Sequence, residues 1–134
     1  MRRGDIVLVD LPQVVGATGH EQIGMRPALI VHDDMTSSNL SVVMIIPVTS
    51  NLTAKNYPHT ILIQPSKQNG LSMPSVLLVF QLRAIDKRRI SKKLGEVEPP
   101  IMEQVNTELK IMLGILLSIL IQNSLNKKML EFGI

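Results

Sequence analysis

The sequence predicts a mainly β protein with a C-terminal helix, in which a small β-barrel or curled sheet is capped by that helix. Two observations lead to this fold class. Short apolar, β-branched runs separated by glycine, proline and asparagine fill the first three quarters of the chain. After Pro99 and Pro100 the apolar residues recur at spacings of three and four, which is typical of one face of a helix. A length of 134 residues suits one domain with a single core.

The strands follow from these apolar runs and from the turn residues between them. The expected strands are Asp5–Asp10, Met25–Val31, Val42–Ile46, Thr60–Ile63 and Ser75–Leu82, with Ile90–Val97 as a candidate last strand. The third run is apolar throughout, so we expect both of its faces to be covered. Pro27 lacks a backbone donor and has a fixed φ, so we expect it at the first residue of its strand. Asn69-Gly70 is a turn signal between the fourth and fifth strands.

The C-terminal part is expected to be one helix and a tail. Prolines can begin a helix but not lie inside one, so the helix starts near Pro99. Its expected apolar face comprises Ile101, Val105, Leu109, Met112 and Leu116, widened by Leu113, Leu117 and Leu120. The apolar run 111–121 is about half the roughly 20 residues that a membrane span needs, so we expect no transmembrane segment.

Taken together, these elements predict one domain over 1–134, with a barrel at about 2–98, a helix at about 99–121 and a tail over 122–134.

Composition excludes some classes of protein. Cysteine is absent, which rules out disulfides and thiolate metal sites. The N-terminus has no apolar signal segment, so a cytoplasmic protein is expected. The net charge is +3, and six cations against one acid lie between Leu82 and Lys93. Such a cluster fits either polyanion binding or a solvated face. Aromatic residues make up 2% of the chain, which argues against base recognition on stacking platforms.

Polar side chains at expected strand ends are the candidates for chemistry. Arg26 precedes an apolar run, and its planar guanidinium suits a phosphate, although a salt bridge at a strand end fits equally well. Thr49, Ser50 and Asn51 follow the third strand. Gln81 and Arg83 are expected at the end of the fifth strand, on one face by period-two alternation. The three histidines are far apart and have no carboxylate at ligand spacing, so no metal constellation is visible.

Four motifs in order resemble the MazF/PemK family of toxin endoribonucleases. They are Arg3-Gly4-Asp5-Ile6-Val7, the block from Gly19-His20-Glu21-Gln22 through Gly24-Met25-Arg26-Pro27-Ala28-Leu29-Ile30-Val31, Ile46-Pro47-Val48-Thr49-Ser50, and Gln81-Leu82-Arg83-Ala84-Ile85-Asp86. The similarity covers roughly residues 2–117. It implies an SH3-like barrel, a homodimer, a toxin neutralised by its antitoxin, and sequence-specific cleavage of single-stranded RNA without a metal or other cofactor.

The resemblance also implies roles for individual residues. Arg26 and Thr49 match the catalytic arginine and threonine of the family, and His20 matches a loop histidine of PemK-type members. With an unperturbed pKa of roughly 6.5, His20 suits a general base. The residues expected to bind RNA are Gly19, Glu21, Gln22, Ser50, Asn51, Gln81 and Arg83. The reaction would be attack of the ribose 2′-OH on phosphorus, giving a 2′,3′-cyclic phosphate and a 5′-OH end.

The sequence departs from the family on the strand before Gln81. Family members commonly have an acidic residue just before this glutamine, and PemK-type members add an arginine two residues earlier. Phe80 and Leu78 occupy these positions. We expect Phe80 to pack in the core. Either His20 and Arg26 then carry the proton steps, or the enzyme is slow or altered in base preference.

Three other readings stay open from the sequence. One is a CcdB-like toxin that poisons DNA gyrase through the C-terminal helix. Another is a nucleic-acid-binding barrel without catalysis, supported by the basic stretch 82–93. The last is a catalytically weak relative, favoured by Leu78 and Phe80. The apolar helix face and tail exceed what one small barrel needs to cover, which favours a dimer. The expected antitoxin offers an acidic or amphipathic disordered segment to the RNA groove.

Overall fold

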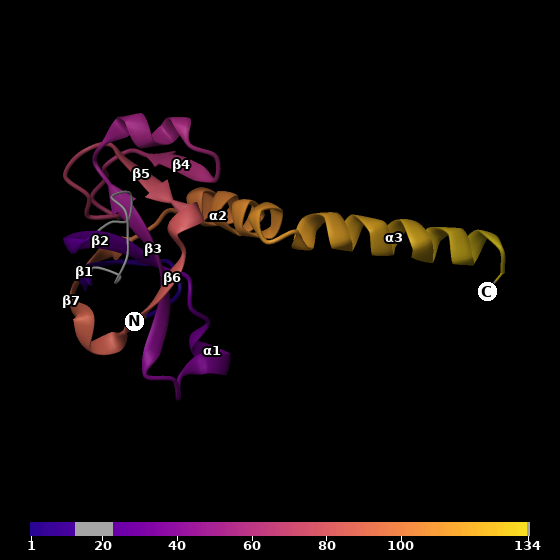
Figure 1. Cartoon of the computed structure of the whole chain (residues 1–134), viewed down its shortest axis with the longest axis horizontal. Coiled ribbons are helices and arrows are strands. Elements are labelled where there is room, and N and C mark those ends of the chain that lie inside the picture. Colours follow the sequence, from indigo (N-terminus) through magenta and orange to yellow (C-terminus); the bar gives the residue numbers. More distant parts are fainter. Residues whose placement is uncertain (13–22, 134) are drawn as a thin grey trace.

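A computed structural model describes residues 1–12 and 23–133 and confirms a mainly β fold with C-terminal helices (Figure 1). The strands are β1 (Asp5–Leu11), β2 (Gly24–Ile30), β3 (Val42–Thr49), β4 (Thr60–Ile63), β5 (Ser75–Leu78), β6 (Arg83–Asp86) and β7 (Ile90–Glu96). The α-helices are α1 (Asp34–Ser37), α2 (Pro99–Met112) and α3 (Ile115–Glu131). Three 3₁₀ turns are η1 (Leu52–Asn56), η2 (Val79–Gln81) and η3 (Lys87–Arg89).

The strands form a curled antiparallel sheet of barrel-like shape, with the order β4-β5-β3-β2-β1-β7. β3 is the central strand, because it pairs with β2 and also with both β5 and β6. The loop between β4 and β5 reaches the opposite edge of the sheet. There the Glu96 backbone N–H donates to Gln68 O at 2.8 Å. This loop therefore connects the edge that ends in β4 with the edge formed by β7.

The core has two main parts, one on each face of the sheet. Ile6, Leu29 and Ile46 belong to the cluster that α2 covers. The neighbouring residues Val7 and Ile45 belong to the other cluster, on the opposite face. The expectation that the third strand is covered on both faces is confirmed. Burial of alternate residues in two clusters explains why these strands read as continuous apolar runs.

α2 covers one cluster through the apolar stripe expected from the sequence. Val105 is fully buried, and Ile101, Leu109 and Met112 pack against the same cluster. The predicted single helix over 99–121 is wrong, because the helix breaks at Gly114. Gly114 has φ +76°, in the left-handed region that glycine adopts readily. α3 then continues to Glu131 and extends away from the barrel (Figure 1).

Two expectations about the strands are wrong. The predicted strand Ser75–Leu82 ends at Leu78, where the chain turns through η2 and starts β6 at Arg83. The apolar pattern concealed this change, because Val79 is buried in the turn just as it would be in a strand. Pro27 is the fourth residue of β2 and lies opposite Leu8. The pairs between β2 and β3 begin at Ala28, so the missing N–H of Pro27 falls just outside that ladder.

Candidate active site

Arg26 and Thr49 lie on neighbouring strands of the sheet. The register between β2 and β3 pairs Ala28 with Pro47 and Leu29 with Ile46. The printed pairs end at Ala28–Pro47, and Arg26 and Thr49 each lie two residues beyond that last pair, where Thr49 pairs with Val76 of β5. Side chains alternate between the two faces of a strand, so Arg26 and Thr49 are on the face that Ala28 and Pro47 share. The sheet therefore puts the two residues at the same end of neighbouring strands, although 22 residues separate them in the sequence.

Arg26 is exposed and available to an anion. Its Nε donates to Ile23 O at 3.3 Å, which ties the guanidinium to the segment before β2. Within the described part of the chain, no carboxylate lies within 4.0 Å of it. The alternative reading of a salt-bridged arginine at a strand end thus finds no described partner. An arginine that keeps its outer N–H groups for a ligand suits a phosphate.

A cavity of about 280 Å³ adjoins Arg26. Its walls include Ser50, which follows β3, and Pro27 of β2. The rest of the lining is apolar or hydroxylic: Val48, Gly70, Leu71, Ser72, Met73, Ser75 and Leu94. The sequence reading singled out Arg26 and Ser50 of this set. It missed the wall formed by 70–73, because these residues carry no charge and belong to no recognised motif.

Thr49 and Asn51 form a hydrogen-bonded turn beside the cavity. Thr49 is 6% exposed, and its Oγ1 accepts from the Asn51 backbone N–H at 3.2 Å. The Thr49 hydroxyl therefore still has its own proton to donate. The Asn51 side chain caps η1, because its Oδ1 accepts from Thr53 N at 3.2 Å and Thr53 Oγ1 at 2.8 Å. Asn51 thus has a local structural role in addition to its predicted role in RNA binding.

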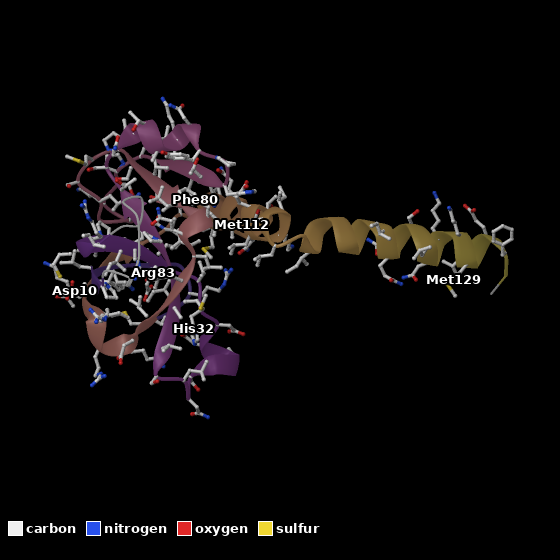
Figure 2. All side chains as sticks on the ribbon, in the orientation of Figure 1. Asp10, His32, Phe80, Arg83, Met112 and Met129 are labelled. Carbon is white, nitrogen blue, oxygen red and sulfur yellow. The ribbon has the colours of Figure 1, made fainter. Side chains whose placement is uncertain are left out.

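Gln81 and Arg83 lie on different elements, so the prediction that one strand carries both is wrong. Gln81 ends η2, whereas Arg83 starts β6 beside Ile45 of β3. Arg83 is half-buried, and its Nη2 donates to Pro12 O at 3.0 Å. Figure 2 places Arg83 over the barrel, below Phe80. Arg83 therefore holds the backbone at Pro12, the residue just after β1. The residues that line the Arg26 cavity do not include Gln81, Arg83, Thr49 or Asn51.

The remaining predicted site residues lie outside the described part of the chain. These are Gly19, His20, Glu21 and Gln22.

Three of the six cations in the basic stretch 82–93, namely Arg88, Arg89 and Lys93, pair with carboxylates of described residues. Arg88 Nη2 lies 2.8 Å from Asp86 Oδ2, and Lys93 Nζ lies 2.7 Å from Glu96 and 3.3 Å from Asp5. The side-chain hydrogen bond from Arg88 lowers the pKa of Asp86 to about 2. The three paired cations fit the solvated-face reading of the stretch.

Phe80 lies at the surface, so its expected core role is wrong. Its side chain is 38% exposed and stacks at a tilt on Tyr57, with 5.7 Å between the ring centroids. Leu78, by contrast, is 2% exposed. The two positions at which the chain departs from the family pattern thus hold a buried leucine and a surface phenylalanine that contacts Tyr57.

In the described ranges, no group of three or more His, Cys, Asp or Glu side chains is arranged to hold a metal ion. None of the described helices is both long and apolar enough to span a membrane.

Comparison with known proteins agrees with this fold. The model for PemK-like, MazF-like toxins of type II toxin–antitoxin systems matches residues 2–113. The chain belongs to this family. Over 115 residues it is 35% identical to "Endoribonuclease MazF" of Staphylococcus saprophyticus, covering 86% of the chain and 92% of that relative. It is 30% identical to "Endoribonuclease EndoA" of Bacillus subtilis over 116 residues, with 87% and 97% covered.

Solved structures of MazF proteins share the fold of this PemK/MazF chain. MazF (Form-I) of Deinococcus radiodurans has a TM-score of 0.67 at 29% identity, with 85% of this chain and 96% of that one covered. The MazE–MazF complex (Form-II) of the same organism has a TM-score of 0.65 at 29% identity, with 86% and 96% covered. The family match ends at residue 113, just before the break at Gly114, so α3 lies beyond it.

Proposed function

We propose that this PemK/MazF chain is a single-domain toxin that cleaves single-stranded RNA as an endoribonuclease. The observation that carries the proposal is the exposed Arg26 guanidinium beside a cavity, with Thr49 at the same end of the neighbouring strand β3. Arg26 has no described carboxylate partner, so its positive charge is available to a phosphodiester. The curated relatives named as endoribonucleases, at 30 and 35% identity over most of the chain, support the same activity.

The proposed reaction needs no group beyond the protein and the RNA. The ribose 2′-oxygen attacks the adjacent phosphorus, so the O2′–P bond forms and the P–O5′ bond breaks. The 2′-OH proton passes to a base, and the leaving 5′-oxygen takes up a proton. The products are a 2′,3′-cyclic phosphate and a 5′-OH end.

Each candidate residue has a defined part in this reaction. Negative charge grows on the phosphoryl oxygens during attack, and the Arg26 guanidinium stabilises it. The Thr49 hydroxyl accepts from Asn51 N and therefore donates its own proton to a phosphoryl oxygen. His20 is the proposed general base. Since Leu78 is buried and Phe80 has no titrating group, the proton steps rest on His20 and Arg26.

The proposed partners follow the family. MazE–MazF complexes of Deinococcus radiodurans, 25–29% identical to this chain, support an antitoxin partner. We expect this toxin to form a homodimer and to act in the cytoplasm.

Incubation of the purified protein with a mixed RNA in EDTA, followed by mapping of the new ends, tests the function. We expect cuts at a short recurring sequence, with cyclic phosphate and 5′-OH termini. A matched oligonucleotide with a 2′-deoxy nucleotide at the cut position should stay intact, because it lacks the nucleophile. Cleavage of that oligonucleotide would disprove the mechanism. Absence of RNA cleavage, with toxicity that survives Arg26→Ala, would favour gyrase poisoning instead.

A further inference from the structure

The loop 64–74, between β4 and β5, is organised around one buried amide. Asn69 is fully buried, and its side chain is hydrogen-bonded at both ends. Its Oδ1 accepts from the backbone N–H groups of Ser66 and Leu71, each at 3.0 Å. Its Nδ2 donates to Gln64 O at 2.9 Å and to the Glu98 carboxylate at 3.2 and 3.3 Å. One side chain therefore holds both halves of the loop and ties them to Glu98.

Glu98 fixes this loop to the rest of the molecule. It lies between β7 and α2, at the residue before α2 begins. Its carboxylate also accepts a hydrogen bond from Ser66 Oγ. Burial raises the pKa of Glu98, but the hydrogen bonds from Ser66 Oγ, from its own backbone N–H and from Asn69 together outweigh it and leave the pKa below its ordinary value. The charged carboxylate is thus the form that suits this contact.

Two glycines bring the loop directly onto β7. A Cβ on Gly70 would lie 2.0 Å from Leu94 O, and a Cβ on Gly95 would lie 2.4 Å from Gln68 O. Gly70 also has φ +71°, which a residue with a side chain rarely adopts. Backbone therefore meets backbone at this crossing, and the loop has little room to shift along β7.

The continuation of this loop forms a wall of the Arg26 cavity. Residues 70–73 line it, together with Pro27 and Ser50. Met73 is 50% exposed, and Ser72 is also exposed. Their thioether and hydroxyl groups are suited to an apolar and a polar contact with a nucleotide.

We propose that Asn69 and Glu98 are positioning residues for RNA, because together they hold the 70–73 wall at a fixed place beside Arg26. This inference rests on the proposed ribonuclease function and adds the part of the site that receives the nucleotide next to the scissile phosphate. Asn69 and Glu98 act through Ser72 and Met73 and do not touch the reacting atoms. Loss of either residue weakens RNA binding while the chemical step is kept.

The test compares Asn69→Ala and Glu98→Ala with the wild type and with a matched control, Glu103→Ala. Glu103 is an exposed carboxylate on α2 that makes no ion pair with a described residue. We expect KM for an RNA oligonucleotide to rise about tenfold in both loop variants, with kcat within about threefold of the wild type. The reason is that the lost contacts bind the substrate equally in the ground state and in the transition state. Glu98→Gln keeps an oxygen for Ser66 Oγ and should restore most of the affinity. Glu103→Ala should match the wild type.

Hydrogen exchange separates positioning from general stability. Amides of 64–73 should exchange faster in Asn69→Ala, while amides of β1 to β3 stay protected. Faster exchange through the whole sheet, or reduced activity at unchanged KM, would show that the hydrogen bonds of Asn69 and Glu98 only stabilise the fold. Either result would overturn the proposal. Unchanged exchange and unchanged KM would overturn it as well.

The same experiments distinguish failure of the positioning proposal from failure of the proposed ribonuclease function. A wild type that cleaves no better than Arg26→Ala would contradict the function. Binding of the uncleavable 2′-deoxy oligonucleotide would then still test positioning, and we expect about tenfold weaker binding by Asn69→Ala. A wild type that does not bind this oligonucleotide would overturn the positioning proposal too.

Discussion

The barrel and α3 use the same residue types in opposite ways. Leu29 of β2 has no exposed surface, whereas Leu125 of α3 is 50% exposed. Figure 2 shows this separation, with Met112 beside the barrel and Met129 far out along α3. Apolar area stabilises a fold only when it leaves water, by about 25 cal/mol per Å². Composition alone therefore says little about which apolar segment carries the stability.

The cause of the difference is the number of covered faces. β1, β2 and β3 contribute alternate residues to two core clusters, one on each side of the sheet. α3 begins after the break at Gly114, and none of its described side chains is buried. Of the two regions, the barrel and α2 match the family, and α3 lies beyond that match.

The largest expected effect is on catalysis by the barrel. Arg26→Ala should lower the rate of RNA cleavage about 10²- to 10³-fold, as for removal of one donor to a transition-state oxyanion. Rates on a defined oligonucleotide, with thermal unfolding to show that the variant is folded, measure this. Arg88→Ala is the matched control, because Arg88 is exposed and paired with Asp86, and it should keep the wild-type rate. A loss of twofold or less in Arg26→Ala would remove Arg26 from the mechanism.

A matched pair of leucine variants tests the comparison directly. Leu29→Ala should lower the free energy of unfolding by about 2–5 kcal/mol, because it leaves a cavity in the core. Leu125→Ala should change it by less than about 0.5 kcal/mol, since half of its surface already faces water. Denaturant unfolding of both variants measures the difference. Equal losses would show that α3 is buried in solution.

We expect low pH to reduce the free energy of unfolding of the barrel because Glu98 becomes protonated. Its pKa is lowered on folding, so its contribution to stability is present above the unfolded pKa of about 4.5 and is lost as the pH falls through the folded value. Unfolding midpoints measured from pH 7 to pH 3 should therefore fall more steeply for the wild type than for Glu98→Gln. Glu131→Gln on α3 is the control and should follow the wild type. Identical slopes for the wild type and Glu98→Gln would contradict this linkage.

The smallest effect is expected from removing α3. A chain that ends at Gly114 keeps the barrel and α2, so its free energy of unfolding should change by less than about 1 kcal/mol. Its cleavage rate should also stay within about threefold of the full chain, because every candidate site residue precedes α3. Thermal unfolding and the oligonucleotide assay measure both. A large drop in either would mean that α3 is part of the working toxin.

Much of the fold could be predicted locally. The strand Thr60–Ile63 and the helix start at Pro99 have the predicted limits, because turn residues and prolines mark them in the sequence. The end of β5 could not be predicted, since Val79 is as apolar in η2 as it would be in a strand. The site shows the same division. Arg26 stands out by its residue type at a strand end, whereas Met73 and Asn69 carry no local signal for a site.

The sequence by itself determined the fold class, the family and the candidate residues Arg26 and Thr49, because periodicity and motifs are local properties of the chain. The tertiary structure decided that Arg26 and Thr49 lie at the same end of neighbouring strands, that the loop held by Asn69 and Glu98 walls the cavity, and that α3 leaves the barrel. These depend on strand register, loop crossing and burial. Each is set by contacts between residues far apart in the chain, and a single sequence carries no direct record of such contacts.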